Sequence, residues 1–287
     1  MRCFVSTIDI RHQVGLLYCR RILFFIPLFL YLFSCPSWGA ASKKPPSLCS
    51  IQYPSDNSVE WECRQLRNNE TLEGLFGDRW RDVARFNRVD RRHAYAGVSI
   101  KVPRVMEEIR DFTPMPSIYP LSEGEAKFIL VDLSEQFLGA YEQGRLAFST
   151  PIATGEAENE TPTGEFRITA FHRHHQSSAY FIKDTDIPYP MNYALRFHVN
   201  RMGVSYWVHG RDLPGYPASH GCIGLYDEPM QQRYYHSPRT PVLEDARTLY
   251  EWVITSLPDD GRFRILKEGP RVLIVGEAPR VANSASK

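Results

Sequence analysis

The chain has 287 residues and an almost balanced charge, with 34 lysines and arginines against 33 aspartates and glutamates. Hydrophobic residues make up 43% of the sequence and charged residues 23%, which is typical of a soluble globular protein. The formal net charge of +1 excludes the strongly basic character of many nucleic-acid-binding proteins, so we expect no nucleic-acid partner.

The first 41 residues predict a secretory signal peptide. Four arginines come first, an uncharged and mostly apolar run occupies residues 22–33, and mostly small residues follow from 34 to 42. The run is interrupted by Pro27 and is shorter than the roughly 20 apolar residues that span a bilayer. We expect cleavage after Ala40 or Ala41 and export to the periplasm or cell envelope. Cleavage removes four arginines and Asp9, which leaves a net charge of −2, and membrane attachment is expected only if Cys35 is lipidated.

Three of the six cysteines, at positions 49, 63 and 222, lie beyond this segment. In an oxidising compartment Cys49 and Cys63, which are close in sequence, are expected to form a disulfide. Cys222 is then left unpaired. An exported free thiol is exposed to oxidation, so a chemical role explains Cys222 better than the alternative of a buried structural cysteine.

Two proline-bearing segments divide the chain that follows the signal peptide. Residues 42–60 are expected to form a polar leader, and residues 105–125 a proline-rich linker, because neither has a helical or strand period. Between them, residues 61–104 form a small unit. Its apolar pattern predicts two short helices, and residues 97–103 alternate like a strand, so we expect the order strand, helix, helix, strand.

This small unit resembles a LysM module. The resemblance rests on Glu70-Thr71-Leu72 near its start, on Phe86-Asn87 in its middle, and on the closing segment 97–103. It implies binding to the N-acetylglucosamine backbone of peptidoglycan. The alternative is a small αβ domain that only packs against its neighbour.

The remaining unit, residues 126–276, is predicted to be mainly β, and residues 277–287 are expected to form a tail. Short β-branched or aromatic runs separated by turn residues predict a sandwich or barrel, so the fold class is α+β and mainly β. Strands are predicted over residues 127–133, 136–141, 146–154, 164–171, 179–182, 193–199, 205–208, 262–266 and 271–275, and helices over 228–235 and 244–257.

One glycine-rich segment of this unit carries both a thiol and imidazoles. Cys222 follows His209 by thirteen positions, and His220 lies between them. A cysteine attacks only as its thiolate, so a nucleophilic cysteine needs a nearby base or positive charge. Either histidine is a candidate for that base.

Four motifs in chain order are similar to the YkuD-type L,D-transpeptidase domain, over about residues 126–276. They are Thr161-Pro-Thr-Gly-Glu-Phe166, Met191-Asn-Tyr-Ala-Leu-Arg-Phe197, His209-Gly210 and Ser219-His-Gly-Cys-Ile223. The resemblance implies a β-sandwich-like domain.

The same resemblance implies roles for the motif residues. Cys222 is the nucleophile that forms a thioester, and His209 is the base, with its second nitrogen held by a backbone carbonyl near Gly210. Gly221 allows a tight turn, so that backbone N–H groups near Gly221 and Cys222 face the oxyanion. Ser219 and His220 shape this turn.

The implied function is a peptidoglycan L,D-transpeptidase. It attacks a tetrapeptide stem, releases the terminal D-alanine and transfers the acyl group to an amine of a second stem, which gives a 3,3 cross-link. Water as acceptor makes it an L,D-carboxypeptidase, and a protein lysine a lipoprotein-anchoring enzyme. A non-catalytic peptidoglycan-binding protein is the alternative of another class, and the absence of a Cys-x-x-Cys motif disfavours a thiol redox protein. No cofactor is expected.

Two features depart from the family pattern. The segment between His209 and Cys222 is shorter than in most members, and Gly224 stands where many members have arginine, so we expect Arg211 or Arg196 to replace that charge. Tyr193 and Arg196 are candidates for the donor groove, and the alternative is that both are only residues of the sheet.

The histidine-rich stretch 172–175 is expected on the surface or in a loop. No metal site is expected there, because no matching Cys, Asp or Glu cluster accompanies it.

Overall fold

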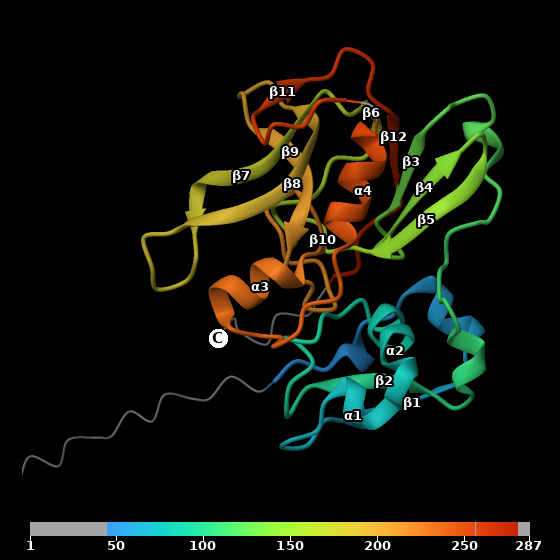
Figure 1. The fold of residues 1–287 in the computed structure, drawn as a ribbon. Helices are drawn as coiled ribbons and strands as arrows, with labels where there is room; N and C mark the ends of the chain where they lie inside the picture. The colour runs from blue at the N-terminus through green and yellow to red at the C-terminus, as the bar shows by residue number, and fades with distance from the viewer. Residues whose placement is uncertain (1–44, 256, 281–287) are drawn as a thin grey trace, which may run out of the picture. The chain divides into compact units, whose positions relative to one another are not determined.

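A computed structural model of the chain describes residues 45–255 and 257–280 (Figure 1). The predicted signal peptide and Cys35 lie outside the described residues. The described chain belongs to one compact unit. No helix in these two ranges combines the length and the hydropathy needed to cross a membrane.

The small unit contains a two-stranded antiparallel sheet and two short helices. Strand β1 (Trp61–Gln65) pairs with β2 (Ser99–Pro103), and α1 (Leu72–Phe76) and α2 (Trp80–Phe86) come between them in the chain. The Thr71 side chain caps α1 by accepting a hydrogen bond from the Gly74 N–H at 3.1 Å. The element order is the one that the sequence predicts.

The segment predicted as a polar leader is packed into this unit. It contains the short 3-10 helices η1 (Leu48–Ser50) and η2 (Pro54–Ser58), and the side chains of Leu48, Ile51 and Tyr53 are at most 5% exposed. Cys49 is bonded to Cys63 of β1, with the two Cα atoms 5.8 Å apart. The described part of the leader, from residue 45, is therefore part of the core of the small unit.

The segment predicted as a linker is also packed. It contains η4 (Met106–Ile109) and η5 (Pro120–Ser122), and Ile109, Phe112 and Met115 are buried. The Phe112 ring lies edge-on to Phe86 of the small unit at 5.1 Å and to Phe137 of the large unit at 5.9 Å. Residues 105–125 thus form a fixed connection rather than a flexible spacer.

The large unit contains two five-stranded sheets, with strand orders β5-β4-β3-β12-β6 and β10-β9-β8-β7-β11. The first sheet is formed by β3 (Phe128–Asp132), β4 (Phe137–Glu142), β5 (Arg145–Pro151), β6 (Gly164–Arg167) and β12 (Arg271–Val275). The second is formed by β7 (Ala170–Phe181), β8 (Pro188–Val199), β9 (Ser205–Arg211), β10 (Ile223–Tyr226) and β11 (Arg264–Ile265).

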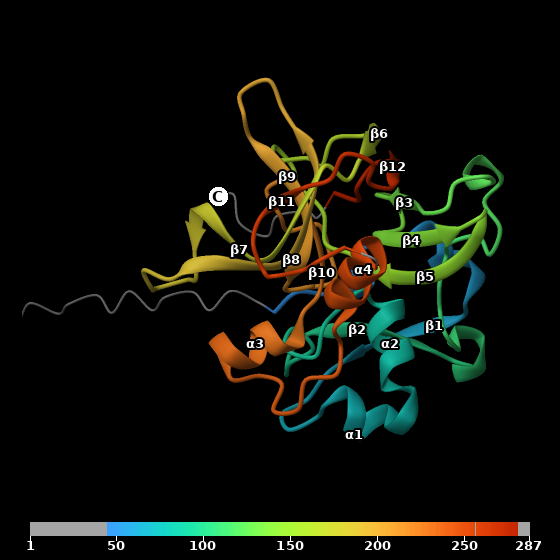
Figure 2. The same cartoon turned by 45° about the horizontal axis from the view of Figure 1, so that its top comes forward.

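A shared hydrophobic core joins the two sheets to helix α4 (Asp245–Ile254). Figures 1 and 2 show α4 between strands β8–β10 and strands β3–β5, and its Leu249 and Tyr250 are fully buried in that core. The mainly β class with few helices is confirmed, as is the predicted helix over 228–235, which is α3 (Glu228–Tyr235).

Two strand predictions need correction. The run 164–171 is not one strand, because β6 belongs to the first sheet and β7 to the second, so the chain changes sheets at residues 168–169. The run 179–182 is not a separate strand either, because it overlaps the end of the twelve-residue β7. Residues 172–175 consequently lie within a strand and not in a loop.

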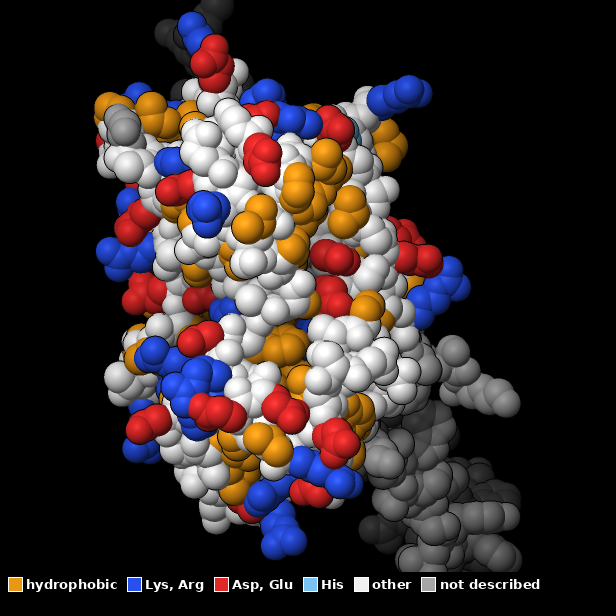
Figure 3. Space-filling view, turned by 90° about the vertical axis from the view of Figure 1, so that its right-hand side faces the viewer, with side chains coloured by type: hydrophobic (Ala, Val, Ile, Leu, Met, Phe, Trp, Pro, Cys, Tyr) orange, Lys and Arg blue, Asp and Glu red, His pale blue; other side chains and the backbone are white. Residues whose placement is uncertain are grey.

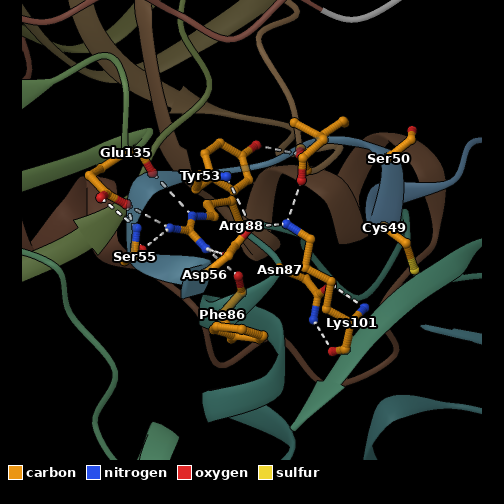
Figure 4. A network of polar contacts seen from close by, with 12 residues as sticks. Cys49, Ser50, Tyr53, Ser55, Asp56, Phe86, Asn87, Arg88, Lys101 and Glu135 are labelled. Atoms are coloured by element: carbon orange, nitrogen blue, oxygen red, sulfur yellow. Dashed lines mark hydrogen bonds and ion pairs between the residues drawn. The ribbon is translucent and has the colours of Figure 1, made fainter. Parts of the chain in front are cut away.

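The contact between the small and large units contains a buried network of charges (Figure 4). The fully buried Arg88 guanidinium forms ion pairs with Asp56 at 3.3 Å and with Glu135, in the β3–β4 turn, at 3.0 Å. Lys101 donates to the other oxygen of Asp56. Burial lowers the pKa of Arg88 and of Lys101, and the two carboxylates partly offset this effect. Two cations therefore face two carboxylates, and the network is neutral overall.

The face drawn in Figure 3 carries lysine, arginine, aspartate and glutamate side chains in an interspersed pattern. No single-sign region dominates it. This agrees with the near-neutral charge of the sequence.

Candidate active site

Strands β9 and β10 bring His209 and Cys222 to the same face of the second sheet. The two strands are parallel, with Ile223 opposite Val208 and Gly224 opposite His209. Ile223 and Val208 point into the core between the sheets. Because successive side chains alternate between faces, His209 and Cys222 project from the opposite face.

The imidazole of His209 is held in one tautomer. His209 is 4% exposed, and its Nδ1 lies 2.8 Å from the carbonyl oxygen of Gly210. A carbonyl only accepts, so Nδ1 carries the hydrogen and Nε2 is left as the basic nitrogen. Burial lowers the pKa of His209 to about 3, so the ring is neutral at neutral pH.

Gly210 leaves room for a carboxylate that the sequence analysis did not single out. A Cβ at Gly210 would lie 2.4 Å from Oδ2 of Asp227. Asp227 caps α3 by accepting from the Met230 N–H at 3.1 Å, and it also accepts from the Asn192 side chain at 3.0 Å. Burial raises the pKa of Asp227. The capping position before Glu228 and Pro229 was the available sequence signal for this residue.

Cys222 is a free, half-buried thiol. It packs against Met191, Ala194 and Trp207. Burial raises the pKa of the thiol, and a hydrogen bond from the Trp207 backbone and the positive charge of Arg211 only partly offset this effect. The thiol is therefore protonated at neutral pH in the free protein.

The turn before Cys222 is held by internal hydrogen bonds. Ser219 Oγ donates to the Cys222 carbonyl at 2.6 Å and accepts from the Gly221 N–H at 3.1 Å. Gly221 has φ +100°, and a Cβ there would lie 2.6 Å from the Tyr206 ring, so only glycine fits. In the free protein the Gly221 N–H is therefore engaged by Ser219, and the expectation that N–H groups near Gly221 and Cys222 face an oxyanion stays a prediction.

A second hydrogen bond ties this turn to the Thr-Pro-Thr-Gly segment. Thr161 Oγ1 donates to the Gly221 carbonyl at 3.0 Å and accepts from the Gly155 N–H at 2.9 Å. The two motifs, 60 positions apart in the chain, are thus in direct contact.

His220 lies on the exposed side of the turn. Its side chain is 45% exposed, and its ring stacks on Tyr180, near the end of β7, with the centroids 4.2 Å apart. His209 is buried and His220 is not, so the two imidazoles occupy different environments. Of the two candidates, His209 has the hydrogen-bonded and sheltered position that a base needs.

The structure separates the two predicted groove residues on β8. Arg196 lies opposite Trp207, and its guanidinium is 5.8 Å from that ring, on the same face as Cys222. Tyr193 instead packs against Tyr250 of α4, with the ring centroids 5.7 Å apart, and contacts the core between the sheets. Tyr193 therefore does not share a face of the sheet with Arg196, and a role for it in a donor groove stays a prediction.

Two histidines of β7 line the same face. The ring of His175 lies 4.3 Å from that of Trp207, and its Nδ1 lies 3.2 Å from Nδ1 of His172. Burial lowers the pKa of His175 to about 4, so this ring is neutral at neutral pH. The strand position explains why these residues are half-buried instead of exposed in a loop.

The small unit holds the segment that leads from His209 to Cys222. The Asp90 N–H donates to the Leu213 carbonyl at 2.8 Å, and the Leu213 N–H donates to the Asp90 carboxylate at 2.7 Å. Gln231 of α3 donates to the same carboxylate oxygen at 2.6 Å. Asp90 is fully buried, so it is a fixed anchor for the active-site segment.

Residues 126–274 match the model of the YkuD family, which describes an L,D-transpeptidase catalytic domain, and the match spans just over half of the chain. No curated protein matches the chain.

Among solved structures, the chain is similar to an L,D-transpeptidase from Stackebrandtia nassauensis, with 23% identity over 55% of this chain and 58% of that one, at a TM-score of 0.36. It is also similar to L,D-transpeptidase 1 from Mycobacterium tuberculosis, with 17% identity over 53% and 62% of the two chains, at a TM-score of 0.34. A mutant of the Enterococcus faecium L,D-transpeptidase has 21% identity over 53% and 50%, at a TM-score of 0.33. The chain spans less than two thirds of the length of each.

Proposed function

The chain belongs to the YkuD family of L,D-transpeptidase catalytic domains through residues 126–274, and on this premise we propose that it is a peptidoglycan L,D-transpeptidase with Cys222 as its nucleophile. One observation carries the assignment of the residues. His209 and Cys222 project from one face of adjacent strands, and the Gly210 carbonyl leaves the Nε2 of His209 free to accept a proton.

In the first half-reaction, Cys222 Sγ attacks the carbonyl that follows the third residue of a tetrapeptide stem. The thiol proton passes to Nε2 of His209 as the S–C bond forms. The C–N bond then breaks, His209 returns the proton to the leaving amine, and D-alanine departs. The product is a thioester on Cys222.

In the second half-reaction, the side-chain amine of a diaminopimelate residue on another stem attacks the thioester. His209 takes a proton from this amine as the N–C bond forms, the C–S bond breaks, and His209 passes the proton to the leaving sulfur of Cys222. The product is a 3,3 cross-link, and the protein returns to its starting state. Water in place of the amine gives hydrolysis, and a protein lysine gives a lipoprotein anchored to the wall.

The burial of His209 and the partial burial of Cys222 support proton transfer coupled to attack, not a pre-formed ion pair. Burial raises the pKa of the thiol and lowers that of the imidazole, so the free protein holds both groups neutral. The Gly221 N–H is bonded to Ser219, so we assign the Cys222 N–H as the backbone donor for the oxyanion.

We assign the small unit to glycan binding as a LysM-like module, and we place the protein in the periplasm or cell envelope. The strand, helix, helix, strand order supports this assignment, as do the Thr71 cap and the resemblance of the motifs. The alternative, a unit that only packs against its neighbour, is favoured by the Arg88 network and the Asp90 contacts. Retention of the mature protein on glycan strands without stem peptides tests the assignment, and loss of retention overturns it.

The activity is tested with purified mature protein and disaccharide tetrapeptides, with products followed by mass. Cross-linked dimers that disappear in Cys222→Ala and in His209→Gln support the proposal, and Arg247→Gln, on the exposed face of α4, is the matched control. D-alanine release without dimers identifies a carboxypeptidase. If the wild type neither turns over stems nor forms a covalent adduct with a carbapenem, the enzymatic proposal is wrong and a binding protein remains.

A further inference from the structure

Arg211 projects a guanidinium from the same face as the thiol and the imidazole. It follows His209 by two positions on β9, and it lies opposite Tyr226 of β10, as His209 lies opposite Gly224. Because residues two apart on a strand share a face, Arg211, His209, Gly224 and Cys222 form one patch of four neighbouring positions.

Gly224 makes room for the Arg211 side chain. A Cβ built at Gly224 would lie 2.1 Å from both Cγ and Cδ of Arg211. The methylene chain of Arg211 therefore lies across the bare backbone of Gly224. No other residue fits at position 224 while Arg211 keeps this path.

The guanidinium is held in place but not neutralised. Its Nη2 donates to the Ala218 carbonyl at 3.0 Å, whereas its Nε is buried and makes no hydrogen bond. Within residues 45–255 and 257–280, no carboxylate lies within ion-pair distance of Arg211. The neighbouring Asp212 is paired with Arg92 at 3.1 Å instead. The guanidinium thus carries a charge that no carboxylate in these ranges neutralises, and one of its N–H donors makes no hydrogen bond.

The charge of Arg211 reaches the reacting groups. Burial raises the pKa of the Cys222 thiol and lowers that of His209, and the charge of Arg211 partly offsets the first effect and adds to the second. The strand register and the contact with Gly224 place the Arg211 side chain next to the position where a substrate carbonyl would meet Sγ. A guanidinium in this position is complementary to a carboxylate, which it can bind with two parallel N–H donors.

We propose that Arg211 is the binding site for a carboxylate of the donor peptide beside the scissile bond. The identity of the ligand rests on the proposed function, whereas the anion site rests on the geometry alone. Two positions along β10 span about 6.6 Å, and successive peptide residues are about 3.8 Å apart. A carboxylate one residue from the scissile carbonyl therefore falls within reach of Arg211 when the carbonyl lies at Cys222.

Two carboxylates of a tetrapeptide stem fit this chemistry. One is the terminal carboxylate of the leaving D-alanine, and the other belongs to the diaminopimelate side chain on the acyl side. Recognition of the first restricts the donor to stems that end one residue after the scissile bond. Recognition of the second selects stems in which this carboxylate is not amidated.

The anion site is tested first with two alkylating probes, iodoacetate and iodoacetamide. In both reactions Sγ forms a bond to the CH2 carbon and iodide leaves with the electron pair, so both consume the same thiolate. The rate with the anionic iodoacetate divided by the rate with the neutral iodoacetamide is therefore independent of thiol ionisation and reports the charge beside Sγ. Both rates are measured by mass on the Cys222 peptide. We expect this ratio to fall about tenfold in Arg211→Gln.

Two further variants sharpen this test. Gly224→Ala keeps the arginine but forces its side chain off the backbone, so we expect the ratio to fall as in Arg211→Gln. Arg247→Gln, in which an exposed arginine is removed from α4, keeps the wild-type ratio. The inference is overturned if the ratio does not change in Arg211→Gln. Equal slowing of both probes gives this outcome and is the result expected of a merely structural role.

The source of the carboxylate is then identified with three donors: the free tetrapeptide stem, its terminal amide and its diaminopimelate side-chain amide. One of the two amides lacks the carboxylate that Arg211 binds. With the wild type, we expect kcat/KM for this amide to be about tenfold lower than for the free stem, and with Arg211→Gln we expect no such difference. Turnover with the same preference in both proteins contradicts the inference and leaves the proposed function intact. The expected probe ratio without turnover of any donor contradicts the proposed function and leaves the anion site intact.

Discussion

Arg88 and Arg211 are two arginines in contrasting surroundings. Arg88, at the contact between the small and large units, is fully buried, and it pairs with Asp56 and Glu135. Arg211, beside the thiol, is half-buried, and it has one carbonyl partner and a buried Nε without a hydrogen bond. The first charge is compensated inside the protein, and the second is not.

This difference separates a structural charge from a functional one. A buried cation between two carboxylates holds segments together, and its removal leaves those carboxylates unpaired. A cation without a carboxylate adds little to the stability of the fold, but it is available to an anionic ligand. The first of four predictions tests this contrast directly, and the other three test further buried contacts, in order of decreasing expected effect.

Replacing Arg88 with leucine is expected to lower the free energy of unfolding by about 3–5 kcal/mol, because Asp56 and Glu135 remain buried without their partner. Arg211→Leu removes one hydrogen bond to a carbonyl and is expected to cost about 1 kcal/mol. Urea denaturation followed by circular dichroism measures both. Equal losses in the two variants would contradict the distinction between the two arginines.

Removing the disulfide tests how firmly the small unit is held together. The pair Cys49→Ser and Cys63→Ser is expected to lose about 3 kcal/mol, the loop-entropy value for a loop of about 15 residues. Cys222→Ser is the matched control, because it removes a sulfur that forms no disulfide. If urea denaturation gives the double variant the stability of this control, the covalent link does not stabilise the fold.

Replacing Asp90 tests whether the small unit restrains the segment from His209 to Cys222. Asp90→Ala leaves the Leu213 N–H without its acceptor, and we expect a loss of about 2 kcal/mol in unfolding free energy. We also expect faster amide hydrogen exchange at Leu213, which is 0% exposed in the native protein. Unchanged exchange at Leu213 would show that the small unit does not restrain this segment.

The buried neutral His209 predicts sensitivity to acid. Its pKa is about 3 in the folded protein and 6.5 in its ordinary state, so between these values the unfolded chain binds more protons. Stability therefore falls as the pH drops below 6.5, by up to about 1.4 kcal/mol per pH unit. Unfolding free energies at pH 7 and pH 5 are expected to differ less in His209→Gln than in the wild type. The exposed His174→Gln is the control, and an identical slope in all three proteins would refute the prediction.

Local patterns in the sequence were sufficient to single out the proposed catalytic residues. The segment from His209 to Cys222 is short, and its glycines, serine and histidines reveal a tight turn around a thiol. The helix over 228–235 and the order of the small unit follow from periodicity and capping, which depend on residues a few positions apart. Cys49 and Cys63 were also identified as a pair, from the expected oxidising compartment and their closeness in sequence.

Contacts between distant segments could not be read in this way. The proline-bearing segments 42–60 and 105–125 have no period of their own, so only the tertiary structure shows that Leu48 and Phe112 are buried. The side to which Tyr193 points depends on a local break in β8, where its φ is +56°, and on Tyr250 of a helix much later in the chain.

The sequence by itself indicated the family of the catalytic domain and the residues that we propose as nucleophile and base, because these are encoded in short motifs. The tertiary structure decided which charges around them are compensated. Whether Arg211 has an acidic partner depends on strand register, on the missing side chain at Gly224 and on the pairing of Asp212 with Arg92. Charge compensation is a property of distances between segments, and those distances exist only in the folded chain.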